Sequence, residues 1–221
     1  MSKSNDISFT CQRCRKDSRF TIWQSINVDL DPKLKQKVID GSLFVFICPF
    51  CQFHQDIVYS VLYHDQTNRF MTWWIPEDER GKQNYNEDEL NMYAKTLFGY
   101  KLRLVPSLNR LREKILIFDC GLDDRAIELL KRYVWSAFLD DLGIQKTWVF
   151  FSSSISENGF PAIDLVILGP GGNRRTFKVG GKNGYPHALE MLQKFMVPAQ
   201  EPTGWRIIDH TYWELADLGQ G

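Results

Sequence analysis

Four of the five cysteines fall into two C-x-x-C pairs, Cys11 with Cys14 and Cys48 with Cys51, while Cys120 stands alone. The thiolates of such a pair can turn toward one metal ion, and two pairs supply the four sulfur ligands of a tetrahedral structural zinc site. Four protein ligands leave no open coordination position, so this chemistry is structural rather than catalytic. We therefore predict one closed Zn²⁺ site with these four cysteines as its ligands.

The same cysteines admit other interpretations. Disulfides require an oxidising compartment, but the polar opening, residues 1–8, lacks the hydrophobic segment of a secretory signal. A thioredoxin-like redox centre requires one C-x-x-C at the start of a helix, whereas both pairs here lie next to strand-like runs. Iron is the alternative metal, because tetrahedral sulfur also suits it. His54 could replace a cysteine as ligand, although a lone histidine at a strand edge is more often a surface residue.

Secondary structure must bring the two pairs together, because 33 residues separate Cys14 from Cys48. Asp31 as N-cap, Pro32 in the first turn and Gly41 past the end predict a short helix within this gap. Each doubling of loop length costs only ~0.6 kcal/mol of closure entropy, against ~10–16 kcal/mol for zinc binding in small peptides. The long gap is therefore compatible with one shared site.

The remaining sequence predicts an α+β fold, in which a zinc ribbon is followed by a β-hairpin extension, a helical segment and a C-terminal α/β portion. The expected strands are residues 56–62, 69–75, 100–105, 147–153, 162–168, 174–179 and 206–209. The expected helices are residues 86–99, 106–121, 123–143 and 186–195, with a surface loop over 76–85. The apolar period changes after Gly143, so residues 1–143 and 144–221 are expected to form two domains, or two layers of one fold.

Charge and hydropathy exclude two broad classes of function. Lys plus Arg and Asp plus Glu both number 27, and each of the two expected domains is separately neutral, so a non-specific polyanion binder is not expected. The longest apolar run is residues 43–47, far shorter than the ~18–20 residues of a membrane-spanning helix. We expect no membrane association and a cytoplasmic location.

A wider set of residues resembles a known family. The set comprises Cys11-Gln12-Arg13-Cys14, Cys48-Pro49-Phe50-Cys51, Asp31-Pro32-Lys33-Leu34, Gly41-Ser42-Leu43, Tyr63-His64-Asp65 and the distal string from Leu102 to Arg125. This pattern resembles the CpXC domain, a mostly bacterial family without an established activity, over roughly Phe9 to Tyr133. The resemblance implies zinc on the four cysteines and a bacterial cytosolic setting.

Three residues depart from the expected patterns. Gln12 stands where the family tends to carry Pro. Arg15 and Gln52 follow the cysteine pairs at positions where many zinc knuckles carry Gly. If those two positions need a positive φ, a residue with a side chain stores strain there, and the affinity for metal is lower.

Several polar groups could do chemistry, but each has a simpler explanation. Asp123, Asp124 and Glu128 could be paired carboxylates, yet the helix dipole alone favours acids at a helix start. His64 and Asp65 could be a general base and its orienting carboxylate, yet adjacent residues in a turn rarely face each other. The sequence therefore contains no convincing catalytic set.

Two basic groups could bind a partner. Arg13, Arg15, Lys16 and Arg19 surround the first cysteine pair, where they either neutralise the metal–thiolate centre or hold phosphates while Phe20 or Trp23 stacks on a base. The second group is expected to be a solvated face: Lys101, Arg103, Arg110, Arg112 and Lys114. One ring of Trp73-Trp74 is expected in the core and the other at an interface.

These patterns lead to one principal prediction and one alternative. The principal prediction is a non-catalytic zinc-binding scaffold that binds a protein partner or, as a second possibility, nucleic acid. The alternative is an enzyme whose pocket lies between the ribbon and the C-terminal region and uses His64, Asp65 or Asp124.

Overall fold

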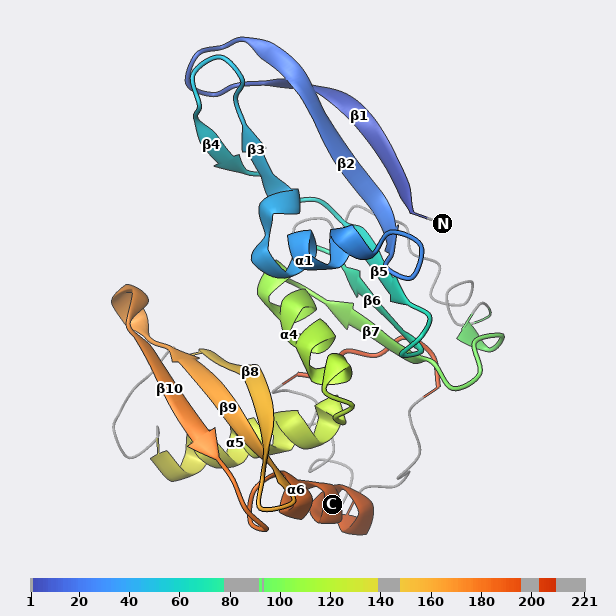
Figure 1. Ribbon diagram of the computed structural model, residues 1–221, viewed down its shortest axis with the longest axis vertical. Helices are drawn as coiled ribbons and strands as arrows, with labels where there is room; N and C mark the ends of the chain where they lie inside the picture. The colour runs from blue at the N-terminus through green and yellow to red at the C-terminus, as the bar shows by residue number, and fades with distance from the viewer. Residues whose placement is uncertain (1, 78–91, 93, 139–147, 196–202, 210–221) are drawn as a thin grey trace. The chain divides into compact units, whose positions relative to one another are not determined.

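The computed structural model describes residues 2–77, 92, 94–138, 148–195 and 203–209 (Figure 1). The strands in this part of the chain are β1 (Lys3–Thr10), β2 (Asp17–Asn27), β3 (Val45–Ile47), β4 (His54–Asp56), β5 (Val61–Asp65), β6 (Phe70–Trp74), β7 (Lys101–Val105), β8 (Trp148–Glu157), β9 (Phe160–Leu168) and β10 (Arg174–Val179). The α-helices are α1 (Pro32–Asp40), α4 (Leu108–Asp119), α5 (Asp124–Phe138) and α6 (Tyr185–Phe195). The predicted α+β class is confirmed.

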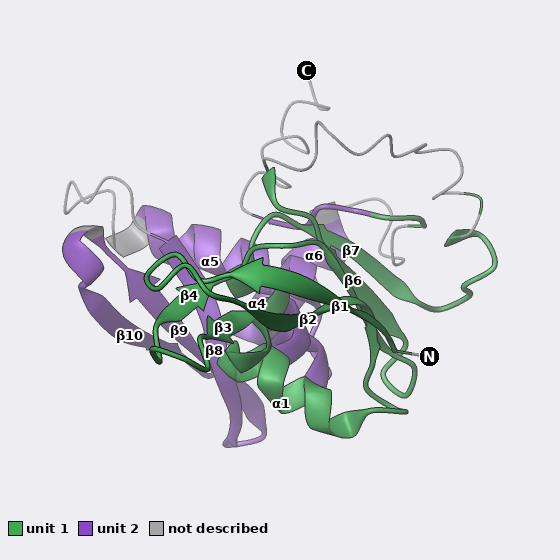
Figure 2. Ribbon diagram, turned by 90° about the horizontal axis from the view of Figure 1, so that it is seen from above, with its two compact units in different colours: residues 1–112, 203–205 green, residues 113–202, 206–221 purple. Residues whose placement is uncertain are grey.

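The chain forms two compact units, coloured separately in Figure 2. Unit 1 comprises residues 1–112 and 203–205, and unit 2 comprises residues 113–202 and 206–221. The predicted division after Gly143 falls inside unit 2, and independent folding of residues 144–221 stays a prediction. Within the described residues, no helix is long and apolar enough to cross a bilayer.

Unit 1 is built on a five-stranded sheet in the order β1-β2-β5-β6-β7. β1 and β2 form a long antiparallel hairpin, and β2 then pairs in parallel with β5. Helix α1 connects β2 to a short antiparallel hairpin of β3 and β4, which forms a separate sheet. This helix begins at Pro32 and ends before Gly41, which adopts a left-handed φ of 82°, as the sequence predicts.

Unit 2 packs helices on a three-stranded antiparallel sheet in the order β10-β9-β8. Helix α5 buries Ile127, Leu130 and Val134 at helical spacing, and it contacts both β8 and α6. Strand β9 lies in the middle of the sheet, and its side chains from Ala162 to Ile167 are largely buried. The predicted helix, strand and turn pattern of this region is therefore found over the described residues.

Two predicted strands need correction. The strand expected at 56–62 instead runs over Val61–Asp65, because the alternate side chains Val61, Tyr63 and Asp65 are buried. Asp65 accepts hydrogen bonds from Asn68, so the turn begins after it rather than at His64. The expected strand at 206–209 is only a single bridge at Arg206. Most of the predicted loop 76–85, half of the helix expected at 86–99 and the end of the helix at 143 lie outside the described residues. The described end of the helix expected at 86–99 is wrong, because residues 95–99 form turns and a bend instead of continuing to Gly99.

Candidate metal centre

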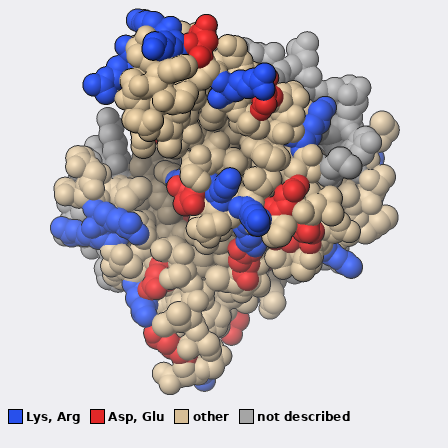
Figure 3. Space-filling view, turned by 45° about the horizontal axis from the view of Figure 1, so that its top comes forward, with Lys and Arg blue, Asp and Glu red and all other residues tan. Residues whose placement is uncertain are grey.

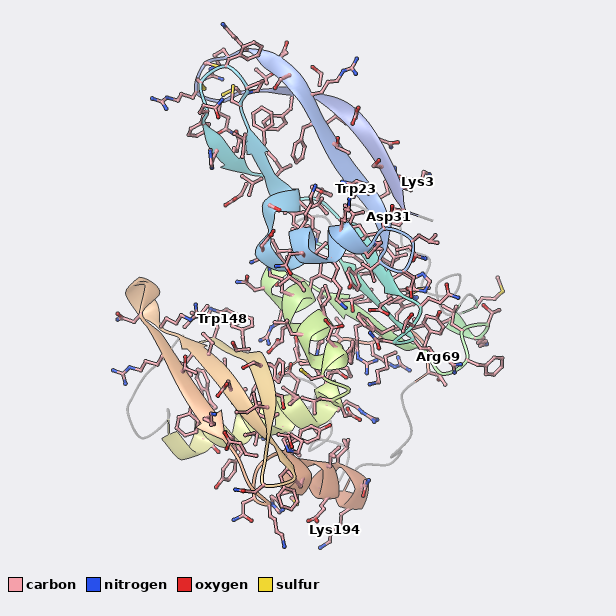
Figure 4. All side chains as sticks on the ribbon, viewed as in Figure 1. Lys3, Trp23, Asp31, Arg69, Trp148 and Lys194 are labelled. Atoms are coloured by element: carbon pink, nitrogen blue, oxygen red, sulfur yellow. The ribbon has the colours of Figure 1, made fainter. Side chains whose placement is uncertain are left out.

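Each cysteine pair lies in the loop that closes one antiparallel hairpin. Residues 11–16 connect β1 to β2 beyond the paired residues Thr10 and Asp17. Residues 48–53, a loop of equal length, connect β3 to β4 beyond the paired residues Ile47 and His54. Figure 1 shows these two loops meeting at the far end of unit 1, and Figure 4 shows sulfur atoms between them. We call residues 9–20 and 45–57 the head.

The two loops have the same backbone conformation. In the first loop, the N–H of Cys11 donates to Lys16 O and the N–H of Arg15 donates to Cys11 O. In the second loop, the N–H of Cys48 donates to Phe53 O and the N–H of Gln52 donates to Cys48 O. These bonds close each loop so that its two cysteines face the other loop.

Arg15 and Gln52 occupy equivalent positions in the two loops and share an unusual backbone conformation. Their φ angles are 63° and 56°, in the left-handed region that favours glycine. Both residues therefore have the positive φ at which a residue with a side chain is expected to store strain. Each residue contributes a backbone N–H that closes its loop, which explains why the chain tolerates the conformation.

The four sulfur atoms lie within 4.8 Å of one another. The Cys11 and Cys51 sulfurs are 3.7 Å apart, and the Cys14 and Cys48 sulfurs are 3.6 Å apart. Sulfurs bound ~2.3 Å from one tetrahedral ion lie about 3.8 Å from each other, whereas a disulfide would bring them to ~2.05 Å. All four cysteines are free, and their arrangement could hold a metal ion.

The protein shifts the pKa values of two of the thiols, Cys11 and Cys51, in opposite directions. Hydrogen bonding, chiefly from the backbone N–H of Cys14, outweighs burial and lowers the pKa of the Cys11 thiol to about 6. Burial raises the pKa of the Cys51 thiol to about 12. A bound divalent cation would supply the positive charge that favours all four thiolates together.

Comparison with known proteins agrees with this arrangement. The sequence profile of the family described as CpXC protein matches residues 9–131, which is more than half of the chain. The chain belongs to the CpXC family. Neither the search of curated proteins nor the search of solved structures returned a match. The matched region of this CpXC protein contains both cysteine loops and all of β2 to β7, so the resemblance predicted from the sequence is confirmed.

Aromatic rings support the cysteine loops in this CpXC protein. The buried centre of the head consists of Cys11, Phe46 and Cys48, and Phe9 packs on Phe46 with ring centroids 4.6 Å apart. Phe20 is partly buried and packs against this core, with its ring 6.0 Å from that of Phe46. A metal cross-link would therefore cap a small apolar core.

A different aromatic ring is exposed on the head. Phe50 is 56% exposed, and the Nζ of Lys16 lies 4.8 Å from the centroid of its ring. Arg13, Arg15 and Arg19 are also exposed. Phe50 is near the basic residues only in space, so no pattern in the sequence marks it as a candidate.

The residues of the predicted enzyme alternative have separate partners. His64 and Asp65 are neighbours in β5, and their side chains point to opposite faces of the sheet. His64 bonds Asn27 and Tyr100, whereas Asp65 bonds Asn68 and pairs with Lys35. Asp124 belongs to unit 2 and pairs with Lys114 at 2.8 Å.

The carboxylates considered at the start of α5 divide into two kinds. Asp123 accepts the backbone N–H of Arg125, which is the helix-capping role that the sequence favours. Asp124 and Glu128 instead belong to a buried ion-pair network, the five residues Glu113, Lys114, Asp124, Glu128 and Lys131.

The second basic group is not a solvated face. Arg103, Arg110 and Lys114 are all buried, and Arg112 is half-buried with its Nε donating to Val38 O. The prediction was wrong because the partners of these cations come from elements distant in sequence, such as Asp124 for Lys114.

The remaining candidates keep minor roles. His54 is exposed in β4, and the cluster of possible metal ligands found among the described residues contains only cysteines. Cys120 is exposed, and partial burial of its thiol raises its pKa, so it lacks the character of a reactive thiolate. Trp74 is buried as predicted, whereas Trp73 is half-buried and its ring lies 5.8 Å from that of Trp205.

Proposed function

We propose that this CpXC protein binds one zinc ion through Cys11, Cys14, Cys48 and Cys51. The spacing of the sulfurs supports this proposal, because it matches the edge of a tetrahedron around a zinc ion. We propose zinc rather than iron because four cysteines are a common ligand set of structural zinc sites, and the proposed structural role requires no redox chemistry. A reducing bacterial cytoplasm suits such a centre, since it keeps the thiols available for metal.

The proposed role of the metal is structural. The zinc would join two hairpin loops whose strands belong to separate sheets, and it would thereby fix the surface that the head presents. A closed shell offers no position for a substrate, and His64, Asp65 and Asp124 each have structural partners. We therefore propose a non-catalytic scaffold that binds a macromolecular partner through the head.

The metal content of the purified protein tests this function. Protein prepared without chelator is expected to contain about one zinc per chain by mass spectrometry of the native protein, as one closed four-sulfur site requires. Cys48→Ser is expected to lose the zinc, whereas Cys120→Ser, which changes a cysteine outside the head, is expected to retain it. Protein that carries no zinc, or that carries iron instead, would contradict the proposal.

A further inference from the structure

We propose that the head binds single-stranded nucleic acid, with Arg13, Arg15 and Arg19 at the phosphates and a base stacked on Phe50. This inference rests on the proposed function, because the cations and the ring come from different cysteine loops. The head brings Lys16 of the first loop to the ring of Phe50 in the second loop, so the surface needs both loops joined.

The first loop carries an excess of positive charge. Residues 10–20 contain four cations and one acid, Asp17, whose carboxylate accepts a hydrogen bond from Thr10 Oγ1. The rest of the head contains one acid, Asp56, so the head as a whole has four cations and two acids, a formal net charge of +2 with His54 neutral. Elsewhere the chain offsets its charges, since its formal net charge is zero, and Figure 3 shows acidic and basic side chains interspersed over much of the face it presents. The head therefore complements a chain of phosphates.

The arginines are available for a ligand. Within the described part of the chain, the side chains of Arg13, Arg15 and Arg19 make no hydrogen bond or ion pair, and all three are exposed. A planar guanidinium can donate two parallel hydrogen bonds to one phosphate.

Phe50 gives the surface a second type of contact. Its ring is more than half exposed and lies beside the ammonium group of Lys16. A flat ring next to cations suits a single strand, whose unpaired bases stack while its phosphates pair with the cations. A duplex keeps its bases stacked internally, and the head has no helix that could enter a major groove. An acidic peptide would match the cations but would leave the ring without a planar partner.

The test measures binding of the zinc-loaded full chain to labelled oligothymidine and oligouridine of about 12 nucleotides, within the ~4–16 nucleotides that single-strand sites cover. Phe50→Ala is expected to weaken binding about 5- to 140-fold, the usual effect of losing one stacked base. Phe50→Trp is expected to bind at least as well as the unaltered protein, because it retains a stacking surface.

Arg15→Gly tests the phosphate contact without disturbing the loop, because glycine adopts the φ of 63° at that position without strain. In a plot of log binding constant against log salt concentration, this substitution is expected to reduce the magnitude of the slope by about 0.7, which is the contribution of one phosphate contact to a single strand. Lys33→Gln removes an exposed cation from α1, outside the head, and is expected to leave the affinity and the slope unchanged.

The outcomes separate this inference from the proposed function. Zinc-loaded protein that binds neither oligonucleotide, or binds them equally well after Phe50→Ala and Arg15→Gly, overturns the inference and leaves the metal scaffold standing. Binding of polyglutamate in place of the oligonucleotides would overturn it in favour of an acidic protein partner. Protein without zinc that still binds oligothymidine through Phe50 would show that the two loops are joined without zinc. It would defeat the zinc assignment and leave only the nucleic-acid surface standing.

Discussion

The head of unit 1 and the ion-pair network of unit 2 both gather charged groups from segments distant in sequence, but they differ in the source of the positive charge. In the head, four thiols converge, and among the described residues no side-chain cation contributes to the pKa shifts of Cys11 and Cys51. In the network, Lys114 and Lys131 lie among three carboxylates, at distances from 2.7 to 3.5 Å. The network takes its positive charge from side chains of the chain itself, whereas the head would take its positive charge from the proposed metal ion.

The network has the same joining role in unit 2 that the metal would have in the head. Lys114 Nζ donates to Ile208 O at 2.6 Å, and the Glu113 carboxylate accepts the backbone N–H of Phe151 at 2.7 Å. These bonds connect α4 to β8 and to the C-terminal segment, while Lys131 extends the network into α5. Burial alone lowers the pKa of Lys114, but the surrounding carboxylates, Asp124 first, raise it overall, so the ammonium form is favoured. Unit 2 is thus expected to keep its packing when metal is removed.

Removing the metal is expected to have the largest effect. The Cys48→Ser substitution or a chelator would remove a cross-link whose formation contributes ~10–16 kcal/mol in small zinc peptides. We expect hydrogen–deuterium exchange to become fast throughout the head, because Phe46 and Phe9 would no longer be held beneath a fixed cap. The amides of α5 and β9 in unit 2 are expected to remain protected.

A matched cysteine substitution gives the control for that experiment. Cys120→Ser removes an exposed thiol outside the head and is expected to leave exchange unchanged in both units. If chelation exposed α5 and β9 as much as β3 and β4, the two regions would not be independent, and the contrast between them would be wrong.

Removing the internal cation of the network is expected to have the next largest effect. Lys114→Met would leave Asp124 and Glu128 buried without their ammonium partner, a change that typically destabilises a protein by ~3–5 kcal/mol. Urea denaturation measures the loss, and the zinc content is expected to stay unchanged. Lys182→Met, at an exposed position in unit 2, is the matched control and should change stability by less than ~0.5 kcal/mol. A loss below ~1 kcal/mol for Lys114→Met would show that the network contributes little energy.

The two regions also differ in how far their sequence predicts them. The four cysteines identify the head, because a C-x-x-C pair brings two ligands together locally and few other roles suit four such residues. The helix that shortens the gap was predicted from Pro32 and Gly41, since both act on the local backbone. Signals that act within one turn of the chain were therefore sufficient to predict the cysteine loops and α1.

The network could not be predicted by the same reasoning. Lys114 follows Glu113 and lies between Leu111 and Ile115, which helical spacing places on the buried face of α4. The helix buries Lys114 as well, because partners from α5 and the C-terminal segment surround it, and no pattern within α4 specifies them. Phe50 was missed for the same reason, since its neighbour Lys16 is brought to it by the fold.

A smaller effect is expected from relieving backbone strain in the head. In the left-handed region, a residue with a side chain destabilises the folded backbone by ~1–2 kcal/mol. Glycine avoids this strain, but it loses ~0.5–1 kcal/mol more conformational entropy on folding. Arg15→Gly is therefore expected to stabilise the head by up to ~1 kcal/mol, measured as tighter zinc binding in competition with a chelator. Arg13→Gly lacks this benefit, because Arg13 does not have a positive φ, and it is expected to weaken zinc binding slightly. Equal effects of the two substitutions would contradict the strain argument.

The smallest effect concerns His64, whose two ring nitrogens contact neutral hydrogen-bond partners, while the nearby carboxylates of Asp29 and Asp65 act to raise its pKa against the effect of burial. Asn27 Oδ1 accepts the N–H groups of Asp29 and Leu30, so Asn27 Nδ2 faces His64 Nδ1 at 3.4 Å. Nδ1 then accepts, and the proton lies on Nε2, 3.2 Å from the Tyr100 hydroxyl. Burial lowers the pKa of His64.

This arrangement predicts both a tautomer and a direction of pH dependence. NMR of the imidazole should show the Nε2–H form and a pKa below the usual ~6.5. Because the folded pKa is the lower one, the stability contribution is complete above pH ~6.5 and declines as the pH falls toward the folded pKa. The decline is expected to be small, since the ring is only half-buried. Asn27→Asp keeps the acceptor for Asp29 and Leu30 but faces the ring with a carboxylate, so it should raise the pKa. An unchanged pKa in that variant would show that Asn27 does not set the protonation of His64. Neutral hydrogen bonds would then not be what keeps this half-buried ring uncharged.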